Sequence, residues 1–343
     1  MNLSVYQQLI SWYLENKRPL PWRETKTPYR VWLSEIMLQQ TRVSQGLPYF
    51  EAFTSKYPTV DKLAKAKEED VLRLWQGLGY YSRARNLHKC AKIVTQEYQA
   101  CFPKSAKELQ KLPGVGSYTA AAIASICFGE KIAVVDGNVL RVISRLFAIN
   151  DDLRDGKTQK HIAKLAQELL VGKDAENYNQ GLMELGALIC TPKNPQCDRC
   201  PLSENCLSYK TGKTASIPFK SPAKKAKRRD IKYKLLINEE NKFIVEQRQS
   251  EKDIWCGLYQ FPEFNPGNVN EENINYGPKT NSYELKKHQL SHQSIYASIE
   301  VHQLKNAKLL SNQRMVNLKE FESLPKPQLI VNCSAILEKE LGA

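Results

Sequence analysis

Residues 112–116 read Leu-Pro-Gly-Val-Gly, and this stretch decides how the first part of the chain is organised. It lies between two runs with apolar residues at helical spacing, Ser105 to Lys111 and Ser117 to Phe128, which predicts helix, tight turn, helix. Gly114 and Gly116 leave backbone N–H groups uncovered in such a turn, and the next helix start adds its positive dipole end. A phosphate is a natural ligand here, although two helices closed by glycines for steric reasons give the same pattern.

Helical spacing extends from Leu3 to about Leu207, with Pro- and Gly-marked turns between the runs. From Lys213 to Asp230 the chain has prolines and many bases but no periodic apolar face, which predicts a linker. Further on, alternate residues from Ile231 to Ile237 are apolar, and a second strand begins near Phe243. We therefore predict a multidomain chain: an all-α domain over 1–212, a basic linker over 213–230, and an α+β domain over 231–343. Within the last domain, the composition of 265–281 predicts a long loop.

The composition narrows the class of protein. Hydrophobic residues make up 42% and charged residues 25% of the 343 residues, which excludes a disordered, collagen-like or coiled-coil chain. The N-terminus lacks the apolar core of a signal peptide, and no stretch approaches the roughly 18 apolar residues of a membrane span. We expect a soluble chain in the cytoplasm that makes no contact with a membrane.

The net charge of +14 favours a polyanionic partner such as nucleic acid or an acidic membrane face. The segment from Lys213 to Lys234 alone holds nine basic residues and one acid, Asp230, and so carries +8 of that total. Mutual repulsion would also keep a solvated linker extended, and this explanation is compatible with phosphate contact.

Four of the nine cysteines form the pattern Cys190-x6-Cys197-x2-Cys200-x5-Cys206, which gathers four thiolates around one point. Disulfides are not expected in a reducing compartment, so the pattern predicts a metal site. Zinc and an iron–sulfur cluster both accept four thiolates, and the long x6 and x5 arms favour the larger cluster.

Three features together resemble the helix-hairpin-helix, iron–sulfur DNA glycosylases: the 112–116 turn, the run Val135-Asp136-Gly137-Asn138-Val139, and the four-cysteine loop. Within that superfamily, the runs 32–41 and 77–85 are similar to the MutY-type adenine DNA glycosylases, and the match covers about residues 3–210. The resemblance implies a [4Fe-4S] cluster on the four cysteines. It also implies a monomeric base excision repair enzyme that cleaves adenine from double-stranded DNA where adenine faces 8-oxoguanine or guanine.

The resemblance assigns catalysis to two carboxylates, because cleaving a purine needs a proton donor for the base and an anion beside the positive sugar. Glu35 is the implied donor, and its pKa must then be raised by an apolar site. Asp136 is the implied anion, with Asn138 positioning it or the sugar. The residues alone would favour Asp136 as a helix N-cap, since an apolar stripe follows directly. Tyr118 stands where strand-cutting relatives carry a Schiff-base lysine, which implies a monofunctional enzyme.

The resemblance also implies a set of DNA-contacting residues, because the target base must leave the duplex. Gln40 and Tyr80 would fill the gap and wedge the duplex open. The other implied contacts are Leu38 and Gln39 beside the wedge, Arg83 and Arg85 on phosphates, and Trp22, Arg23 and Gln180 around the adenine.

In the last domain, residues 257–263 resemble the strand that leads into a Nudix box, without the glutamates and arginine that bind magnesium in such hydrolases. The family uses this Nudix-like domain to recognise 8-oxoguanine. Its recognition loop commonly reads Phe-Ser-His, whereas this chain has Leu290-Ser291-His292, which retains Ser291 and His292 and lacks the stacking aromatic.

Two other functions remain open. An endonuclease III-like pyrimidine glycosylase and lyase is disfavoured by Tyr118 and by the extra C-terminal domain. A non-catalytic iron–sulfur DNA-binding sensor is disfavoured because it needs neither Glu35 nor Asp136.

Overall fold

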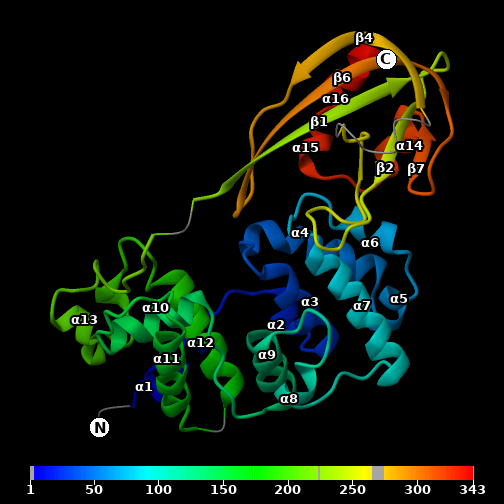
Figure 1. Ribbon diagram of the computed structural model, residues 1–343. Coiled ribbons are helices and arrows are strands. Elements are labelled where there is room, and N and C mark those ends of the chain that lie inside the picture. The colour runs from blue at the N-terminus through cyan, green and yellow to red at the C-terminus, as the bar shows by residue number, and fades with distance from the viewer. Residues whose placement is uncertain (1–3, 173, 223–224, 265–273, 343) are drawn as a thin grey trace. The chain divides into compact units, whose positions relative to one another are not determined.

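The computed structural model describes residues 4–172, 174–222, 225–264 and 274–342 (Figure 1). The chain divides into two compact units. Unit 1 comprises Met1–Phe50, Lys56–Ala64 and Lys89–Ala223, and unit 2 comprises Glu51–Ser55, Lys65–His88 and Lys224–Ala343. Unit 2 thus combines the C-terminal part with two segments of the helical part. The sequence-based division at 212/213 and 230/231 remains a proposal, and β1 (Lys227–Ile237) begins inside its linker.

The order of elements confirms the predicted fold class, in which a helical part precedes a part built on a sheet. The helices of the first part are α1 (Val5–Asn16), α2 (Pro21–Glu24), α3 (Pro28–Leu38), α4 (Val43–Lys56), α5 (Val60–Ala64), α6 (Glu68–Leu74), α7 (Ser82–Glu97), α8 (Ala106–Leu109), α9 (Ser117–Phe128), α10 (Gly137–Leu146), α11 (Gly156–Leu169), α12 (Ala175–Leu188) and α13 (Leu207–Lys210). No described helix is long and apolar enough to cross a membrane.

The core of unit 1 is organised around α12, which packs against α1, α9 and α10. The apolar stripe predicted after Asp136 is the buried face of α10, where Val139, Ile143 and Leu146 are at most 4% exposed. α9 is apolar on every side and is buried from Thr119 to Ser125, as expected of a helix inside a core. α9, α10 and α12 position Tyr118, Asp136 and Gln180 respectively.

The predicted helix–turn–helix is present, with a shorter first helix than expected. α8 ends at Leu109 and turn residues follow, because Pro113 has no N–H to bond the carbonyl of Leu109, which accepts the N–H of Leu112 at 3.1 Å instead. Gly114 adopts the left-handed region at φ 74°, and Gly116 is the N-cap of α9 without a side-chain cap. Gly114 and Gly116 are both exposed, so the first N–H groups of α9 face an open surface.

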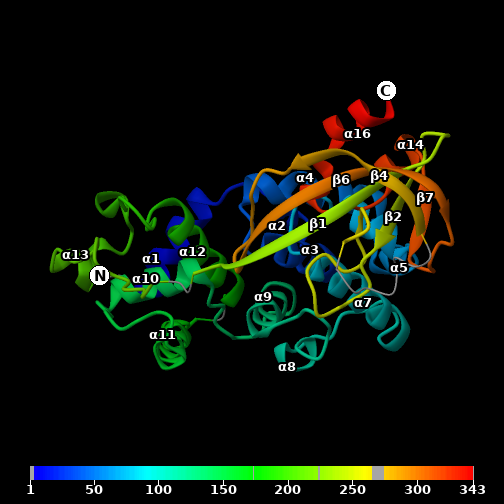
Figure 2. The ribbon, with the colours of Figure 1, turned by 45° about the horizontal axis from the view of Figure 1, so that its top comes forward.

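Unit 2 contains one mixed sheet in the order β3-β2-β1-β6-β4, with β5 paired to β6 and β7 paired to β2. Its strands are β1, β2 (Phe243–Gln247), β3 (Tyr259–Gln260), β4 (Ile274–Glu284), β5 (His288–Gln289), β6 (Gln293–Ala307) and β7 (Gln313–Val316). Figure 2 shows the long strands β1, β6 and β4 side by side. The strand and its hairpin to β2 are confirmed, but the alternation of β1 ends at Tyr233, because all residues from Tyr233 to Ile237 are buried. Three helices complete the unit: α14 (Leu318–Ser323), α15 (Gln328–Val331) and α16 (Ser334–Leu341).

The predicted loop over 265–281 is wrong in its second half. Residues 274–281 belong to β4, which pairs antiparallel with β6 and shifts register near Gly277 and Pro278. These turn-forming residues are accommodated at irregularities of the ladder, where a missing N–H costs little. Residues 265–273 lie outside the described part of the chain.

Candidate active site

Glu35 and Asp136 line the same hollow in unit 1. Two adjoining cavities of about 380 and 470 Å³ share Glu35, Leu38, Tyr118 and Asp136 in their walls. Glu35 comes from α3 and Asp136 from the N-cap of α10, so residues a hundred positions apart meet because their helices pack in one core. Two carboxyl groups at one cavity can act together on one bound group.

Burial raises the pKa of Glu35 to about 7, and the nearby charge of Asp136 contributes to the rise. A hydrogen bond from Tyr118 and the charge of Arg23 oppose it. Of the apolar residues near Glu35 on α3, Trp32 and Met37 are buried in the core, whereas Val31 and Leu38 line the cavity. The apolar cavity wall comes from Leu20, Trp22, Val31, Leu38, Ile126 and Met183.

Asp136 is the N-cap of α10, as the residues alone predict, and it also lines the cavity, while its catalytic role stays a prediction. One oxygen accepts the N–H of Val139 at 2.7 Å, and the other accepts Nδ2 of Asn138 at 2.7 Å. Burial raises the pKa of Asp136 above its ordinary value, while the donors from Val139 and Asn138 limit that rise. Because Asp136 has these donors at the positive end of α10, it is the better site for the negative charge of the pair.

Tyr118 lies on the first turn of α9, close enough to Glu35 and Asp136 to interact with the charges of both. Its hydroxyl hydrogen-bonds Glu35 and lies 3.4 Å from Sδ of Met183. Burial, together with the charges of Glu35 and Asp136, holds the pKa of Tyr118 well above its usual range. The tyrosine is therefore a neutral donor toward the carboxyl of Glu35.

The first cavity ends in a charged network that holds the predicted adenine-contacting residues. Nε of Arg23 donates to Gln180 at 3.0 Å, and Nη2 of Arg23 donates to Glu184 at 2.8 Å. Arg18 adds two bonds to Glu184 at 2.7 and 2.8 Å. Although burial raises the pKa of Glu184, the hydrogen bonds from Arg18 and Arg23 lower it to about 2. Trp22 lines the same cavity and packs edge-on against Phe50 at 5.0 Å.

The second cavity opens toward the glycine turn. Its wall includes Gln39, Gln40 and Gly116 beside the two acids. Gln40 is exposed and has a positive φ of 55°, and Nε2 of Gln39 donates to Thr119 at 3.3 Å. The structure thus brings these sequence-predicted DNA contacts to the rim of the cavity that contains Glu35 and Asp136.

The run around Tyr80 lies in unit 2. Tyr80 is 43% exposed at the end of a tight turn, where its own φ is 49°. Arg83, by contrast, is buried, and its Nη2 donates to the carbonyl of Gly79 at 3.2 Å. Burial lowers the pKa of Arg83 to about 10. The phosphate contact of Arg83 stays a prediction, and it would require this buried side chain to turn outward. Nη1 of the half-buried Arg85 donates to the carbonyl of Cys256 at 2.8 Å.

Ser291 and His292 are exposed in the turn between β5 and β6, in unit 2. Oγ of Ser291 and Nδ1 of His292 are 3.4 Å apart. The carbonyl of His292 accepts the N–H of Lys227 at 3.0 Å, which ties the turn to β1. Such a supported, exposed turn is suited to contact a ligand.

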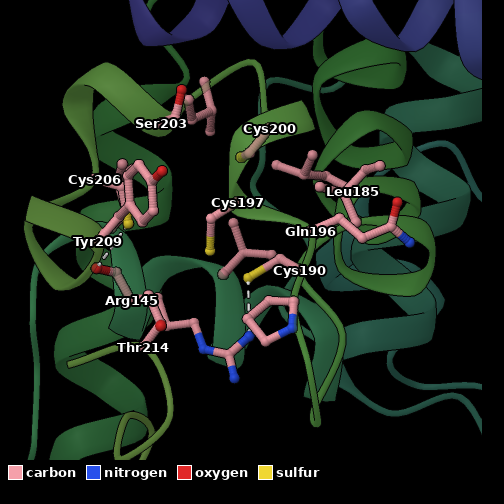
Figure 3. A pocket seen from close by; sticks show the side chains of 15 residues that line it. Arg145, Leu185, Cys190, Gln196, Cys197, Cys200, Ser203, Cys206, Tyr209 and Thr214 are labelled. Carbon is pink, nitrogen blue, oxygen red and sulfur yellow. Dashed lines mark hydrogen bonds between the residues drawn. The ribbon is translucent and has the colours of Figure 1, made fainter. Parts of the chain in front are cut away.

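The four cysteines of the 190–206 loop surround one cavity (Figure 3). Among the described residues, no group of three or more His, Cys, Asp or Glu side chains is placed to hold a single metal ion. Arg145 is buried behind the loop, and its Nη1 lies 3.3 Å from Sγ of Cys190 and 2.7 Å from the carbonyl of Thr191. Arg145 thus places a positive charge beside a sulfur that would carry negative charge as a ligand of an iron–sulfur cluster.

Sequence reasoning missed Glu184 and the two arginines of α10. Arg141 donates to Oδ1 of Asn138 at 2.9 Å and to the carbonyl of Cys190 at 2.7 Å, so it connects the positioning partner of Asp136 with the first cysteine. Helical spacing could have indicated these residues, because residues four apart lie on one face of a helix. Gln180 and Glu184 are such a pair on α12, and Arg141 and Arg145 are such a pair on α10.

Comparisons with known proteins agree with this geometry. Residues 33–169 match the model of the HhH-GPD superfamily base excision DNA repair protein, residues 190–206 the iron–sulfur binding domain of endonuclease III, and residues 232–335 the NUDIX domain. The chain is 38% identical over 306 residues to an adenine DNA glycosylase of Buchnera aphidicola subsp. Schizaphis graminum, covering 86% of this chain and 87% of that protein. It is 45% identical over 207 residues to the Homo sapiens adenine DNA glycosylase, covering 58% of this chain and 38% of that protein. The solved structure of a thermostable thymine-DNA glycosylase aligns with a TM-score of 0.54 at 30% identity, covering 60% of this chain and 95% of that chain.

Proposed function

Because the chain belongs to the adenine DNA glycosylase family, we propose that it hydrolyses the N-glycosidic bond of adenine paired with 8-oxoguanine or guanine in duplex DNA. The observation that carries this proposal is the cavity shared by Glu35 and Asp136, where burial raises the pKa of Glu35 to about 7 and hydrogen bonds from Val139 and Asn138 limit the rise in the pKa of Asp136. Glycosidic bond cleavage needs one neutral and one ionised acid of this kind.

Glu35 acts as the general acid. With a pKa of about 7 it is protonated in about half of the molecules at pH 7, whereas an ordinary glutamate at 4.5 is protonated in about one in 300. Its proton passes to the departing adenine. The electron pair of the glycosidic bond leaves with the base, and the deoxyribose becomes oxocarbenium-like. Protonation of the base lowers the cost of that departure.

Asp136 acts as the anion beside the sugar, held by Val139 and Asn138 in the orientation that the α10 cap imposes. Its negative charge stabilises the developing positive charge on the ring. Water then adds to the anomeric carbon, and the product is an abasic site. Trp22, Arg23 and Gln180 contact the extruded base, and Leu38, Gln39 and Gln40 contact the DNA at the rim of the cavity.

The enzyme is monofunctional in this proposal. Tyr118 has no amine to form a Schiff base with the sugar, and its hydroxyl is bonded to Glu35. The pyrimidine glycosylase and lyase activity of endonuclease III-like enzymes is the second candidate, and the absence of a lysine at position 118 disfavours it.

Cys190, Cys197, Cys200 and Cys206 hold the [4Fe-4S] cluster, in agreement with the match of this loop to an iron–sulfur binding domain. When bound, the cluster crosslinks the loop through four thiolates. Gly114 and Gly116 bind a phosphate through backbone N–H groups, and Ser291 and His292 contact the base opposite the adenine. The enzyme acts as a monomer in the cytoplasm.

The test uses duplexes that differ only in the base opposite adenine, namely 8-oxoguanine, guanine or thymine, with purified protein in excess. Free adenine and abasic sites are measured with and without alkali. We expect adenine release opposite the first two bases, and strand breaks only after alkali. Adenine release opposite thymine at the same rate would contradict the proposed specificity. Strand breaks without alkali would contradict the monofunctional chemistry.

A further inference from the structure

Lys326, in unit 2, holds the turn that presents Tyr80. Its backbone N–H donates to Oε1 of Gln76 at 3.0 Å, and its carbonyl accepts the hydroxyl of Tyr81 at 3.2 Å. Gln76 and Tyr81 bracket the turn Gly77–Tyr80, so one residue from the C-terminal part binds both ends of it. The two bonds fix the spacing between the turn's ends.

The turn needs such support because its backbone is unusual. Gly77, Gly79 and Tyr80 all have positive φ, at 97°, 76° and 49°. A tyrosine in this region is strained, and such a residue persists only when its surroundings impose it. The hydroxyl of Tyr81 also accepts the N–H of Gly77 at 3.3 Å, and Nε1 of Trp75 donates to the carbonyl of Gly79 at 3.0 Å.

Lys326 is itself rigidly placed. It lies between Pro325 and Pro327, whose rings restrict φ, and the carbonyl of Pro325 accepts the N–H of Tyr259 on β3 at 2.8 Å. Lys326 is 5% exposed, and its ammonium donates to the carbonyls of Phe321, Glu322 and Leu324 at the end of α14. A movement of the Tyr80 turn away from Lys326 would therefore break bonds to an anchored partner.

Further contacts join the same two segments of unit 2. Arg314 pairs with Glu69 at 3.2 Å, Arg85 donates to the carbonyl of Cys256, and a Cβ at Gly257 would lie 2.8 Å from Leu72. The C-terminal part thus contacts residues 65–88 at several places. We call the two bonds from Lys326 to Gln76 and Tyr81 the Lys326 clamp, and they are the contacts that lie at the turn.

We propose that Gln76, Tyr81 and Lys326 are positioning residues for base extrusion: they hold Tyr80 in its exposed, left-handed conformation so that it can wedge into the duplex. The inference rests on the proposed function and on the role of Tyr80 as wedge. It gives the C-terminal part a task in extrusion that is separate from reading the opposite base.

The test separates extrusion from chemistry. 2-Aminopurine replaces the target adenine, and all proteins carry Asp136→Asn so that the base stays attached. The rise of 2-aminopurine fluorescence on binding then reports unstacking. Tyr81→Phe keeps the ring and removes both hydroxyl bonds, and we expect the extrusion equilibrium to fall about three- to tenfold, the range for losing a hydrogen bond. Tyr283→Phe, which removes a hydroxyl bond to Glu340 elsewhere in unit 2, should leave extrusion unchanged.

A double-mutant cycle with Tyr80→Ala distinguishes positioning from a general loss of stability. If the clamp acts through Tyr80, Tyr81→Phe should have no further effect once Tyr80 is alanine. The inference would be overturned if Tyr81→Phe left base extrusion unchanged. It would also be overturned if Tyr81→Phe reduced extrusion equally in proteins with Tyr80 and with Tyr80→Ala. Gln76→Ala removes the other bond of the clamp and replaces Tyr81→Phe if that variant does not fold. Absence of adenine release by the unmodified protein would instead count against the proposed function.

Discussion

Replacing Tyr118 by phenylalanine should shift the pH dependence of base release in a direction that the site geometry fixes. The Tyr118 hydroxyl donates to Glu35 and stabilises its charged form, opposing the rise in pKa that burial and Asp136 produce. Phenylalanine removes this donor and leaves burial in place. The pKa of Glu35 should therefore rise above about 7. Because Glu35 must be protonated to act, activity is present below its pKa and is lost as the pH rises through it.

The size of the shift follows from the kind of bond removed. A hydrogen bond to a charged group contributes about 1.5–3 kcal/mol, and one pKa unit corresponds to about 1.4 kcal/mol. The basic limb of the rate profile, where activity falls as the pH rises, should therefore move to higher pH by about one to two pH units. At pH 7 the protonated fraction would rise from about half to nearly all, so this effect alone raises the rate by at most about twofold.

Single-turnover adenine release between about pH 5 and pH 10 measures this shift, with DNA binding checked by anisotropy at each pH. Tyr29→Phe is the matched control, because it removes a buried hydroxyl bond to the Tyr57 carbonyl but does not line the cavity. Its basic limb should coincide with that of the unmodified enzyme. A Tyr118→Phe limb that stays in place or moves to lower pH would refute the reasoning about Glu35.

Four further outcomes follow from the same geometry. Asp136→Asn should slow base release by at least about a hundredfold while anisotropy shows unchanged DNA binding, and near-parental single-turnover activity would remove its assigned role. Asn138→Leu removes a donor that lowers the Asp136 pKa, so the acid limb of the rate profile should move to higher pH; a limb that does not move would show that this bond does not tune the carboxylate. Arg145→Ala should lower the iron and sulfide bound per chain after dialysis, and full retention would show that Arg145 does not stabilise the cluster loop. Ser291→Ala combined with His292→Ala should narrow the rate ratio between 8-oxoguanine and guanine partners, whereas an unchanged ratio would place recognition elsewhere.

The sequence predicted those parts of the site that are formed by residues close together in the chain. The glycine turn and the four-cysteine loop are each set by spacing within one segment, and both are present. The convergence of Glu35 and Asp136 came from the family resemblance, because nothing in the spacing of residues a hundred positions apart shows that α3 and α10 share a cavity.

What the sequence did not reveal depends on long-range packing. Glu184 is ionised because Arg18 and Arg23 reach it from more than 150 positions away. The grouping of 65–88 with the C-terminal part rests on contacts such as that between Tyr81 and Lys326, which no local pattern indicates. Residues 274–281, the second half of the loop predicted over 265–281, form a strand because pairing with β6 overrides the turn tendency of their glycine and proline.

The proposed mechanism requires one cavity to hold a neutral acid at position 35 and an anion at position 136. Carboxyl-labelled ¹³C NMR titrations of the full-length protein test it directly, with Glu35→Gln and Asp136→Asn identifying the two resonances. We expect the Glu35 carboxyl to titrate near pH 7 and Asp136 to lose its proton at lower pH. A Glu35 resonance that titrates near pH 4.5 would contradict the proposed mechanism. So would an Asp136 carboxyl that loses its proton at higher pH than Glu35.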